Sequence, residues 1–264
     1  MRTQDIIDHI VNWLTDYVKA ASMEGFVVGV SGGIDSAVTA SLCAQTGKRV
    51  LLVNMPIYQD PNQISRSQEH IDGLTQRFPR VEGITQDLTP AFAQMEKNFP
   101  KGIQDDLTMA NTRSRLRMLT LYAFGGHHRL LVAGTGNKVE DFGVGFYTKY
   151  GDGGVDISPI ADLMKSQVYE LGKALDVPAS ILNAPPTDGL FGDDRTDEAQ
   201  IGASYDELEA AMDHEALPPE DRAAAEAGMS SREKEVLSIY RGRHRANRHK
   251  MIPIPVCTIP PHLK

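Results

Sequence analysis

The stretch FVVGVSGGIDSAVTASLCAQ, residues 26–45, decides the fold. Residues 26–30 form a short apolar run that predicts a buried strand, and residues 34–45 have the character of a helix. Between them, the turn SGGIDS at 31–36 places unpaired backbone N–H groups at the N-terminus of the helix. Those donors and the helix dipole both favour a phosphate group. The stretch therefore predicts a phosphate-binding strand–turn–helix unit.

The residue types in this turn indicate which kind of phosphate ligand it could bind. Gly32 and Gly33 let the backbone approach a ligand closely, and the hydroxyls of Ser31 and Ser36 add donors. The turn is not GxxxxGK[ST], because no lysine follows the glycines, and its glycine spacing does not match GxGxxG either. Asp35 would repel a phosphate unless a bound Mg²⁺ bridged the two. The alternative is an ordinary glycine turn in which Asp35 caps the helix.

Outward from the turn, strand-like and helix-like segments alternate. Strands are predicted at 49–56, 81–86 and 130–133, and helices at 62–78 and 108–124. This order predicts an α/β fold, an open parallel sheet with helices on both faces. Residues 134–159 are glycine-rich and are predicted to be a ligand-facing loop, as are residues 183–197. Helices are predicted again at 161–175, 205–214 and 231–249.

The bulk composition bounds the class of protein. With 264 residues, 41% of them hydrophobic, we expect a single domain over residues 1–264. The net charge of −8 argues against a nucleic-acid-coating protein. Cys43 and Cys257 form no CxxC pair, so we expect two reduced thiols in a cytoplasmic protein and no zinc site. No apolar run approaches the roughly 20 residues that span a membrane.

Four motifs together resemble a known family. SGGIDS is similar to the pyrophosphate-binding motif of the N-type ATP pyrophosphatases, whose fold is Rossmann-like (adenine nucleotide alpha-hydrolase-like). NTRSRLRMLTLY at 111–122, GTGNKVE at 134–140 and FYTKYGDGGVDISP at 146–159 resemble, within that superfamily, the ammonia-dependent NAD synthetases. The similarity runs from about residue 25 to about residue 250.

The resemblance implies a reaction and a set of site residues. Deamido-NAD would be adenylated by ATP, releasing pyrophosphate, and ammonia would then displace AMP to give NAD. Mg²⁺ would be held by Asp35 and Glu140. A separate hypothesis, not taken from the family, is that Asp152 binds or deprotonates ammonium. The implied ATP contacts are Gly29, Val30, Ser31, Gly32, Gly33, Ile34, Asp35, Ser36, Thr135, Lys165 and Thr187. The implied deamido-NAD contacts are Arg115, Lys149, Asp156, His249 and Lys250.

Plainer interpretations exist for some of these residues. Glu140 would then be a solvated loop acid, Lys165 a solvated helix lysine, and His249 and Lys250 a solvated helix end. Arg113 and Arg117, four residues apart, share a helix face that Arg115 does not share, and they would be ordinary surface charge. The two predicted loops, taken as 134–152 and 183–197, are candidate lids.

Two further expectations concern partners. Glutamine-dependent relatives carry an additional glutaminase domain for which this chain has no room, so free ammonia or a separate subunit would supply nitrogen. The family resemblance implies a homodimer, with the N-terminal helix and the helix at 108–124 as either interface or core. The competing functions are another ATP pyrophosphatase, amidating or sulfur-transferring, and a non-catalytic ATP-binding sensor.

Overall fold

A computed structural model describes residues 2–187, 190 and 196–264. Its strands are β1 (Gly25–Gly29), β2 (Arg49–Asn54), β3 (Val81–Thr85) and β4 (Leu130–Val132). They form one parallel sheet in the order β3-β2-β1-β4, with Val28 of β1 paired to Leu52 of β2. The predicted parallel sheet and its four strands are confirmed.

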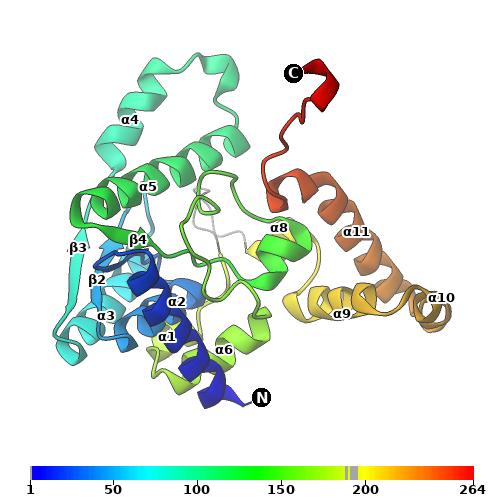
Figure 1. Ribbon diagram of the computed structural model, residues 1–264, viewed down its shortest axis with the longest axis horizontal. Coiled ribbons are helices and arrows are strands. Elements are labelled where there is room, and N and C mark those ends of the chain that lie inside the picture. Colours follow the sequence, from blue (N-terminus) through cyan, green and yellow to red (C-terminus); the bar gives the residue numbers. More distant parts are fainter. Residues whose placement is uncertain (1, 188–189, 191–195) are drawn as a thin grey trace.

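Helices surround this sheet. The first half of the chain contains α1 (Thr3–Ala20), α2 (Ile34–Gln45), α3 (Pro61–Arg77), α4 (Thr89–Asn98), the short 3₁₀ turn η1 (Lys101–Ile103) and α5 (Asp106–His128). The second half contains η2 (Val139–Val144), α6 (Lys165–Ala174), α7 (Ala179–Leu182), α8 (Asp197–Ile201), α9 (Tyr205–Ala216), α10 (Pro219–Gly228), α11 (Ser231–Met251) and η3 (Pro261–Leu263). Figure 1 shows these elements in their spatial arrangement.

Both faces of the sheet are buried, as the apolar strands predict. Phe26 and Val28 of β1 pack with α1, α2, α3, α6 and α7, whereas Val27 between them packs on the opposite face with α4 and α5. On α1 the buried side chains are Ile7, Ile10, Leu14 and Val18, whose spacing places them on one face of the helix. The helix at 108–124 is longer than predicted, because α5 runs from Asp106 to His128.

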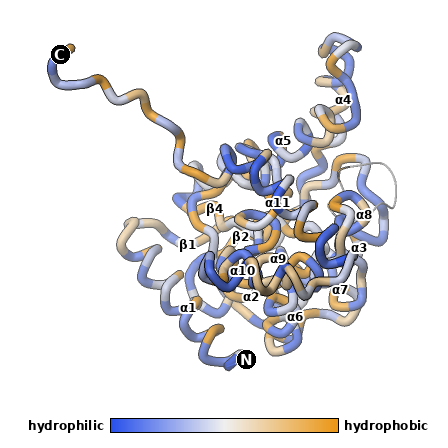
Figure 2. Tube along the Cα trace, turned by 90° about the vertical axis from the view of Figure 1, so that its right-hand side faces the viewer, coloured by the Kyte–Doolittle hydropathy of each residue, from blue (hydrophilic) through white to orange (hydrophobic). Residues whose placement is uncertain are grey.

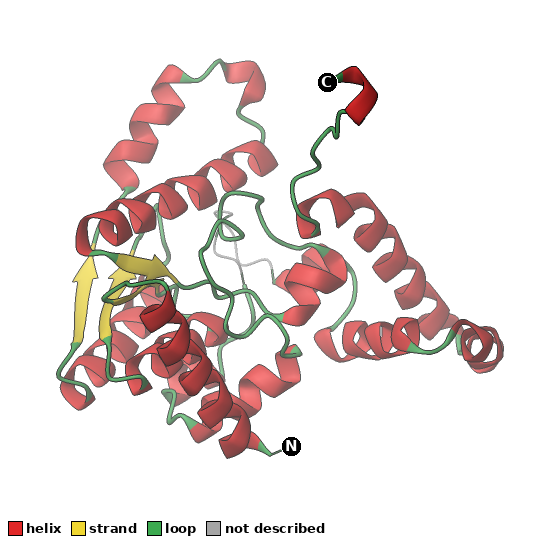
Figure 3. Cartoon of the chain, in the orientation of Figure 1, coloured by secondary structure: helices red, strands yellow, loops and turns green. Residues whose placement is uncertain are grey.

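A third apolar cluster lies apart from the sheet. It joins η2, α9 and α11 through residues such as Val144, Leu208 and Leu237. The long connection from β4 to α6 lies between the sheet and these C-terminal helices, and Figure 3 shows that it is mostly loop. This connection therefore carries residues of both regions to one place.

The structure corrects the prediction of loop throughout 134–159. Val139–Val144 form a π-helix, because its apolar ends Val139 and Val144 are fully buried against α9 and α11 and fix one helical turn inside the glycine-rich run. The second predicted loop, 183–197, lies partly outside the described residues.

After α11 the chain leaves the body of the molecule. Figures 1 and 2 both show this segment extending away from the helices. It contains strongly exposed apolar side chains, including Ile254 and Val256, which are 66% and 82% exposed. None of the described helices combines the length and the apolar character that crossing a membrane requires.

Candidate active site

The predicted phosphate-binding turn follows β1 and leads into α2. Gly32 has a φ of +83°, and a Cβ there would lie 2.7 Å from the carbonyl oxygen of Gln63, so only glycine fits without strain. The hydroxyls of Ser31 and Ser36 lie 3.1 Å apart, and the Ser31 hydroxyl also accepts from the Gly33 N–H. These bonds hold the turn closed, while the first N–H groups of α2 have no partner within the helix.

Three charged side chains meet beside this turn. The Lys165 ammonium lies 2.6 Å from Asp35 Oδ2 and 2.9 Å from Glu140 Oε1. Lys165 is the first residue of α6 and its side chain is only 4% exposed, while those of Asp35 and Glu140 are 17% and 16% exposed. The interpretations of Glu140 and Lys165 as solvated charges are therefore wrong. Asp35 and Glu140 are 105 positions apart in the sequence, yet both pair with the Lys165 ammonium.

Two residues that the sequence interpretation missed orient these carboxylates. The Asn137 amide donates to Asp35 Oδ1 at 3.0 Å, and its oxygen accepts from the backbone N–H of Glu140 at 3.1 Å. The Tyr205 hydroxyl donates to Glu140 Oε1 at 2.6 Å, and its ring centroid lies 4.6 Å from the Lys165 nitrogen. Asn137 stands in the quoted motif GTGNKVE, but Tyr205 comes from α9 and only the tertiary fold reveals it.

Burial and charge act against each other in this group. Burial acts to lower the pKa of Lys165, but the two carboxylates outweigh it and raise that pKa above its ordinary value. Burial acts to raise the pKa of Glu140, yet Lys165 and the Tyr205 hydrogen bond hold it below its usual range. Burial, together with the charge of Glu140, raises the pKa of Asp35. A buried pair of acids thus depends on a neighbouring cation.

A cavity of about 250 Å³ opens beside the three charges. All eleven predicted ATP contacts line it: Gly29, Val30, Ser31, Gly32, Gly33, Ile34, Asp35, Ser36, Thr135, Lys165 and Thr187. Arg117 also lines this cavity, and its guanidinium donates to Met55 O at 3.1 Å and to Gln59 Oε1 at 2.8 Å. Arg113 donates to the carbonyl of Leu190 at 2.8 Å. The expectation that Arg113 and Arg117 are ordinary surface charge is therefore wrong.

A smaller cavity of about 170 Å³ adjoins the first. Asp141 and Asp152 line both cavities, and Lys250 lines the smaller one. The Lys250 ammonium donates to the carbonyls of Gly145 and Tyr147 and lies 4.7 Å from the centroid of the Tyr147 ring. Loss of hydration raises the pKa of Asp141 well above its ordinary value, and the charge of Glu140 adds to this rise. Lys250 is thus no solvated helix end.

The GDGG loop, residues 151–154, is hydrogen-bonded to α5. The Ser114 hydroxyl donates to Asp152 Oδ1 at 2.6 Å and accepts from the Asp152 N–H at 2.8 Å. A Cβ on Gly151 would lie 2.2 Å from the Ser114 oxygen, so glycine is needed for this close approach. Loss of hydration raises the pKa of Asp152, although the hydrogen bonds from the Ser114 hydroxyl and the Thr148 N–H oppose that rise. Asp152 keeps an open side toward the cavities.

Four of the predicted deamido-NAD contacts line neither cavity. Arg115 donates to the carbonyl of Lys149 at 3.4 Å, and the Lys149 ammonium donates to the carbonyl of His249 at 2.8 Å. Asp156 accepts from the Tyr122 hydroxyl at 3.0 Å and from the Val132 N–H at 2.8 Å. Arg115, Asp156 and His249 are exposed and Lys149 is half-buried, and all four lie outside the two cavities, whereas Lys250 lines the smaller one.

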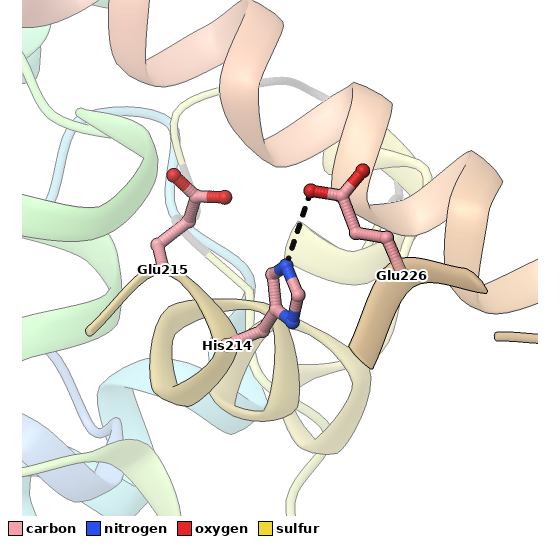
Figure 4. Close-up of side chains that lie close together, drawn as sticks. All are labelled: His214, Glu215 and Glu226. Atoms are coloured by element: carbon pink, nitrogen blue, oxygen red, sulfur yellow. Dashed lines mark hydrogen bonds and ion pairs between the residues drawn. The ribbon is translucent and has the colours of Figure 1, made fainter. Parts of the chain in front are cut away.

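A second group of potential metal ligands lies in the C-terminal helices. His214, Glu215 and Glu226 offer ligand atoms within 4.8 Å of one another (Figure 4). However, the Arg241 guanidinium lies 2.7 Å from Glu215 and also pairs with Glu226, and His214 lies 3.3 Å from Glu226. These acids are already neutralised, so the group is an ion-pair network that joins α9, α10 and α11.

Comparison with known proteins finds similarity to NAD synthetases over most of the chain. A family model described as NAD synthase matches residues 6–253. The NH(3)-dependent NAD(+) synthetase of Mesoplasma florum is 37% identical over 217 residues, which are 80% of this chain and 84% of that protein. The NH(3)-dependent NAD(+) synthetase of Syntrophomonas wolfei is 34% identical, and the match covers 100% of both chains. The solved structure of NMN synthetase from Francisella tularensis has a TM-score of 0.82 and 32% identity, covering 98% of each chain.

Proposed function

Because this chain belongs to the NAD synthase family, we propose that it converts deamido-NAD to NAD with ammonia while cleaving ATP to AMP and pyrophosphate. It is a ligase of the last step of NAD biosynthesis, as its relatives are. The observation that carries the proposal is the buried Asp35–Lys165–Glu140 group at the turn before α2. A phosphate-binding helix terminus beside a cation-dependent pair of acids suits a triphosphate with its metal.

The metal proposed here is Mg²⁺, held by Asp35 and Glu140. These two carboxylates fit it because both already face one cation, and oxygen ligands are what Mg²⁺ prefers. When bound, Mg²⁺ would neutralise the negative charge that builds up on the departing pyrophosphate. Asn137 and Tyr205 would keep the two carboxylates in position.

In the first half-reaction, an oxygen of the nicotinate carboxylate attacks the α-phosphorus of ATP. The bond from that phosphorus to the β-phosphate bridging oxygen breaks, and pyrophosphate leaves with that electron pair. The N–H groups at the start of α2 and the Lys165 ammonium, which line the cavity, would bind the leaving group. Most of the catalysis would come from positioning and charge neutralisation, without a protein nucleophile.

In the second half-reaction, ammonia attacks the activated carbonyl carbon and AMP leaves. Ammonia is mostly protonated at neutral pH, so the ammonium ion must lose a proton before it attacks. Asp152 is the proposed acceptor, because its carboxylate has a raised pKa and lines both cavities. Full activity of Asp152→Asn across the pH range at saturating ammonium would contradict this role.

Arg115, Lys149, Asp156 and His249 lie outside both cavities, which favours a deamido-NAD site completed by a second copy of the chain. We propose a homodimer in which α5 contributes to the interface. Its outer face carries Leu119 and Tyr122, which are 61% and 37% exposed, and the proposed dinucleotide contact Arg115 lies on the same helix. The two unpaired cysteines, Cys43 and Cys257, agree with the reducing cytoplasm as the proposed location.

One comparison favours a second candidate. The relative from Francisella tularensis is an NMN synthetase, and its similarity extends over 98% of the chain. The corresponding reaction here would be amidation of nicotinate mononucleotide, which has the same carboxylate but lacks the adenylate half of deamido-NAD. The two candidates share the ATP site, and the size of the second substrate distinguishes them.

The deciding experiment supplies the pure protein with ATP, Mg²⁺ and ammonium chloride, and with either deamido-NAD or nicotinate mononucleotide. AMP, pyrophosphate and the amide product are measured together. We expect kcat/KM for deamido-NAD to exceed that for the mononucleotide by at least about tenfold, because the larger substrate makes more contacts. A reversed ratio would assign the second candidate, and no AMP with either substrate would refute both. Glutamine in place of ammonium should support little turnover.

A further inference from the structure

The Lys165 side chain occupies an unusual position for a phosphate-binding lysine. Its ammonium lies between the two proposed metal ligands, 2.6 Å from Asp35 and 2.9 Å from Glu140. We propose that Lys165 is an internal cation that fills the metal position in the empty site, and that metal and ATP displace it only together. This inference rests on the proposed function, since it assigns the order of events at that same site.

The first argument is electrostatic. Asp35 and Glu140 are nearly buried, and two like charges so close together need a cation if both are to stay ionised. Lys165 supplies that cation and leaves the group with one net negative charge. A divalent ion that entered without displacing the lysine would leave one net positive charge, with two cations only a few ångströms apart. The lysine therefore competes with a metal ion that arrives alone.

The second argument concerns where the ammonium goes. The Lys165 side chain is only 4% exposed, and its ammonium pairs with Asp35 and Glu140 and lies over the ring of Tyr205. If it left them in the absence of ATP, it would lose both ion pairs for a cavity wall. A triphosphate on the turn at 31–36 offers new negative oxygens in the cavity that Lys165 already lines. Metal binding and the movement of the lysine would thus favour each other only when ATP is present.

The third argument is that the carboxylates are held independently of the lysine. Asn137 donates to Asp35 Oδ1, whereas Lys165 contacts Oδ2 of the same carboxylate. Glu140 is held by the Tyr205 hydroxyl and, through its backbone N–H, by Asn137. When the ammonium leaves, these bonds can remain. The two acids would then present their oxygens to the metal without rearranging.

The test measures binding of Mn²⁺, used as a spectroscopic substitute for Mg²⁺, by electron paramagnetic resonance with no deamido-NAD present. Lys165→Met removes the charge and keeps the length of the side chain, and Lys165→Arg keeps the charge. Lys173→Met is the matched control, because Lys173 lies on the same helix and pairs with Glu170 at the surface. Each protein is titrated with Mn²⁺ alone and again with a non-hydrolysable ATP analogue.

Without nucleotide, we expect Lys165→Met to bind Mn²⁺ at least about tenfold more tightly than the wild type, because the competing charge is gone. Lys165→Arg and Lys173→Met should bind it as weakly as the wild type. The analogue should tighten Mn²⁺ binding to the wild type much more than to Lys165→Met. Equal affinity of the wild type and Lys165→Met for Mn²⁺ alone would overturn the proposal, as would tight binding by Lys165→Arg.

Removal of the lysine leaves two buried acids without a partner, so Lys165→Met is expected to be less stable than the wild type. Thermal unfolding with and without Mn²⁺ therefore serves as a second readout. Mn²⁺ alone should raise the unfolding temperature of Lys165→Met and leave that of the wild type nearly unchanged, and an equal rise in both would count against the proposal. A wild type that makes NAD but shows no such difference would refute this inference and leave the proposed function standing.

Discussion

At the scale of single residues, Tyr205 connects the C-terminal helices to the candidate metal site. Its hydroxyl donates to Glu140 at 2.6 Å, and α9, to which it belongs, lies in the apolar cluster apart from the sheet. A hydrogen bond to a charged group is worth about 1.5–3 kcal/mol, and its loss leaves Glu140 with less support. We therefore propose that the tyrosine is a positioning residue that sets the affinity of the proposed metal site.

We predict that Tyr205→Phe raises the Mg²⁺ concentration needed for half-maximal activity by roughly tenfold, in line with the loss of one charged hydrogen bond. The rate at saturating Mg²⁺ should fall much less. Steady-state rates of pyrophosphate release over a range of Mg²⁺ concentrations measure both quantities. Tyr240→Phe is the matched control, because Tyr240 is buried in the same cluster and its ring stacks on His244. An unchanged Mg²⁺ requirement in Tyr205→Phe would refute the positioning role.

Sequence analysis identified the charged centre but not the residues that orient it. Asp35, Glu140 and Lys165 were assigned to one site through the family resemblance, and the structure brings them within ion-pair distance. The direct contact of Lys165 with both acids was not expected. No local pattern predicts the contact between Tyr205 and Glu140, because it depends on how α9 packs against η2.

At the scale of elements, the GDGG loop depends on its attachment to α5. Ser114 is buried and makes two hydrogen bonds to Asp152, one with the side chain and one with the backbone. We predict that Ser114→Ala lowers kcat/KM for ammonium by about tenfold, because the carboxylate is released from a charge-assisted bond. The affinity for ATP should stay the same.

The comparison for this prediction is Thr120→Ala, on the same helix, since the Thr120 hydroxyl donates to the carbonyl of Leu116 in the preceding turn and to no other group among the described residues. Initial rates at varied ammonium concentration, with ATP and deamido-NAD saturating, measure the effect. If Ser114→Ala and Thr120→Ala behaved alike, the bond from Ser114 to the loop would have no functional importance.

The packing of α3 on α2 predicts a dependence of stability on pH. His70 of α3 is buried, and its Nε2 lies 3.0 Å from the carbonyl oxygen of Ala37 in α2. Burial lowers the pKa of His70 from 6.5 to about 4. The neutral form is favoured in the folded state, so this contribution to stability is complete above pH 6.5 and is lost as the pH falls toward 4.

We predict that His70 contributes a loss of about 2 to 3 kcal/mol in the free energy of unfolding between pH 7 and pH 4. His70→Gln keeps a donor for the Ala37 carbonyl without a titrating group, so its stability should fall less over the same range. Urea unfolding at several pH values measures the difference. Parallel pH profiles for the two proteins would show that the histidine is not responsible.

Element prediction succeeded where a periodic or apolar pattern was long enough. The four strands and α1, α2, α3, α5, α9 and α11 were all predicted, with ends that differ by a few residues. The π-helix Val139–Val144 was missed because glycines surround it and its apolar residues find their partners only in distant helices. The helix α10 was missed as well, since it has no buried side chain to give it an apolar stripe.

At the scale of the whole molecule, the candidate site lies where two regions meet. Asp35 comes from α2 and Lys165 from α6, two helices that pack on the sheet. Glu140 comes from η2, whose apolar residues belong to the cluster with α9 and α11. Apolar clusters flank the sheet on each face, and the third supports η2. We therefore propose that the two regions act as one functional unit, since among the described residues neither region alone contains the three charges.

The proposed dimer yields the last prediction. Leu119 on α5 is 61% exposed, so Leu119→Arg should leave the folding of a single chain intact and introduce a charge into the interface. We expect it to shift the protein toward monomers in sedimentation velocity and to raise KM for deamido-NAD by about tenfold or more, because a second subunit would complete that site. Binding of ATP, whose proposed contacts all come from one chain, should not change.

Trp13→Arg provides the contrasting variant for this prediction. Trp13 is 39% exposed on α1, which covers the opposite face of the sheet from α5. If α5 forms the interface, Trp13→Arg should remain dimeric with an unchanged KM for deamido-NAD. If Trp13→Arg dissociated and Leu119→Arg did not, the interface would involve α1. A fully active monomer of either variant would mean that one chain contains the whole deamido-NAD site, and that Arg115, Lys149, Asp156 and His249 serve another purpose.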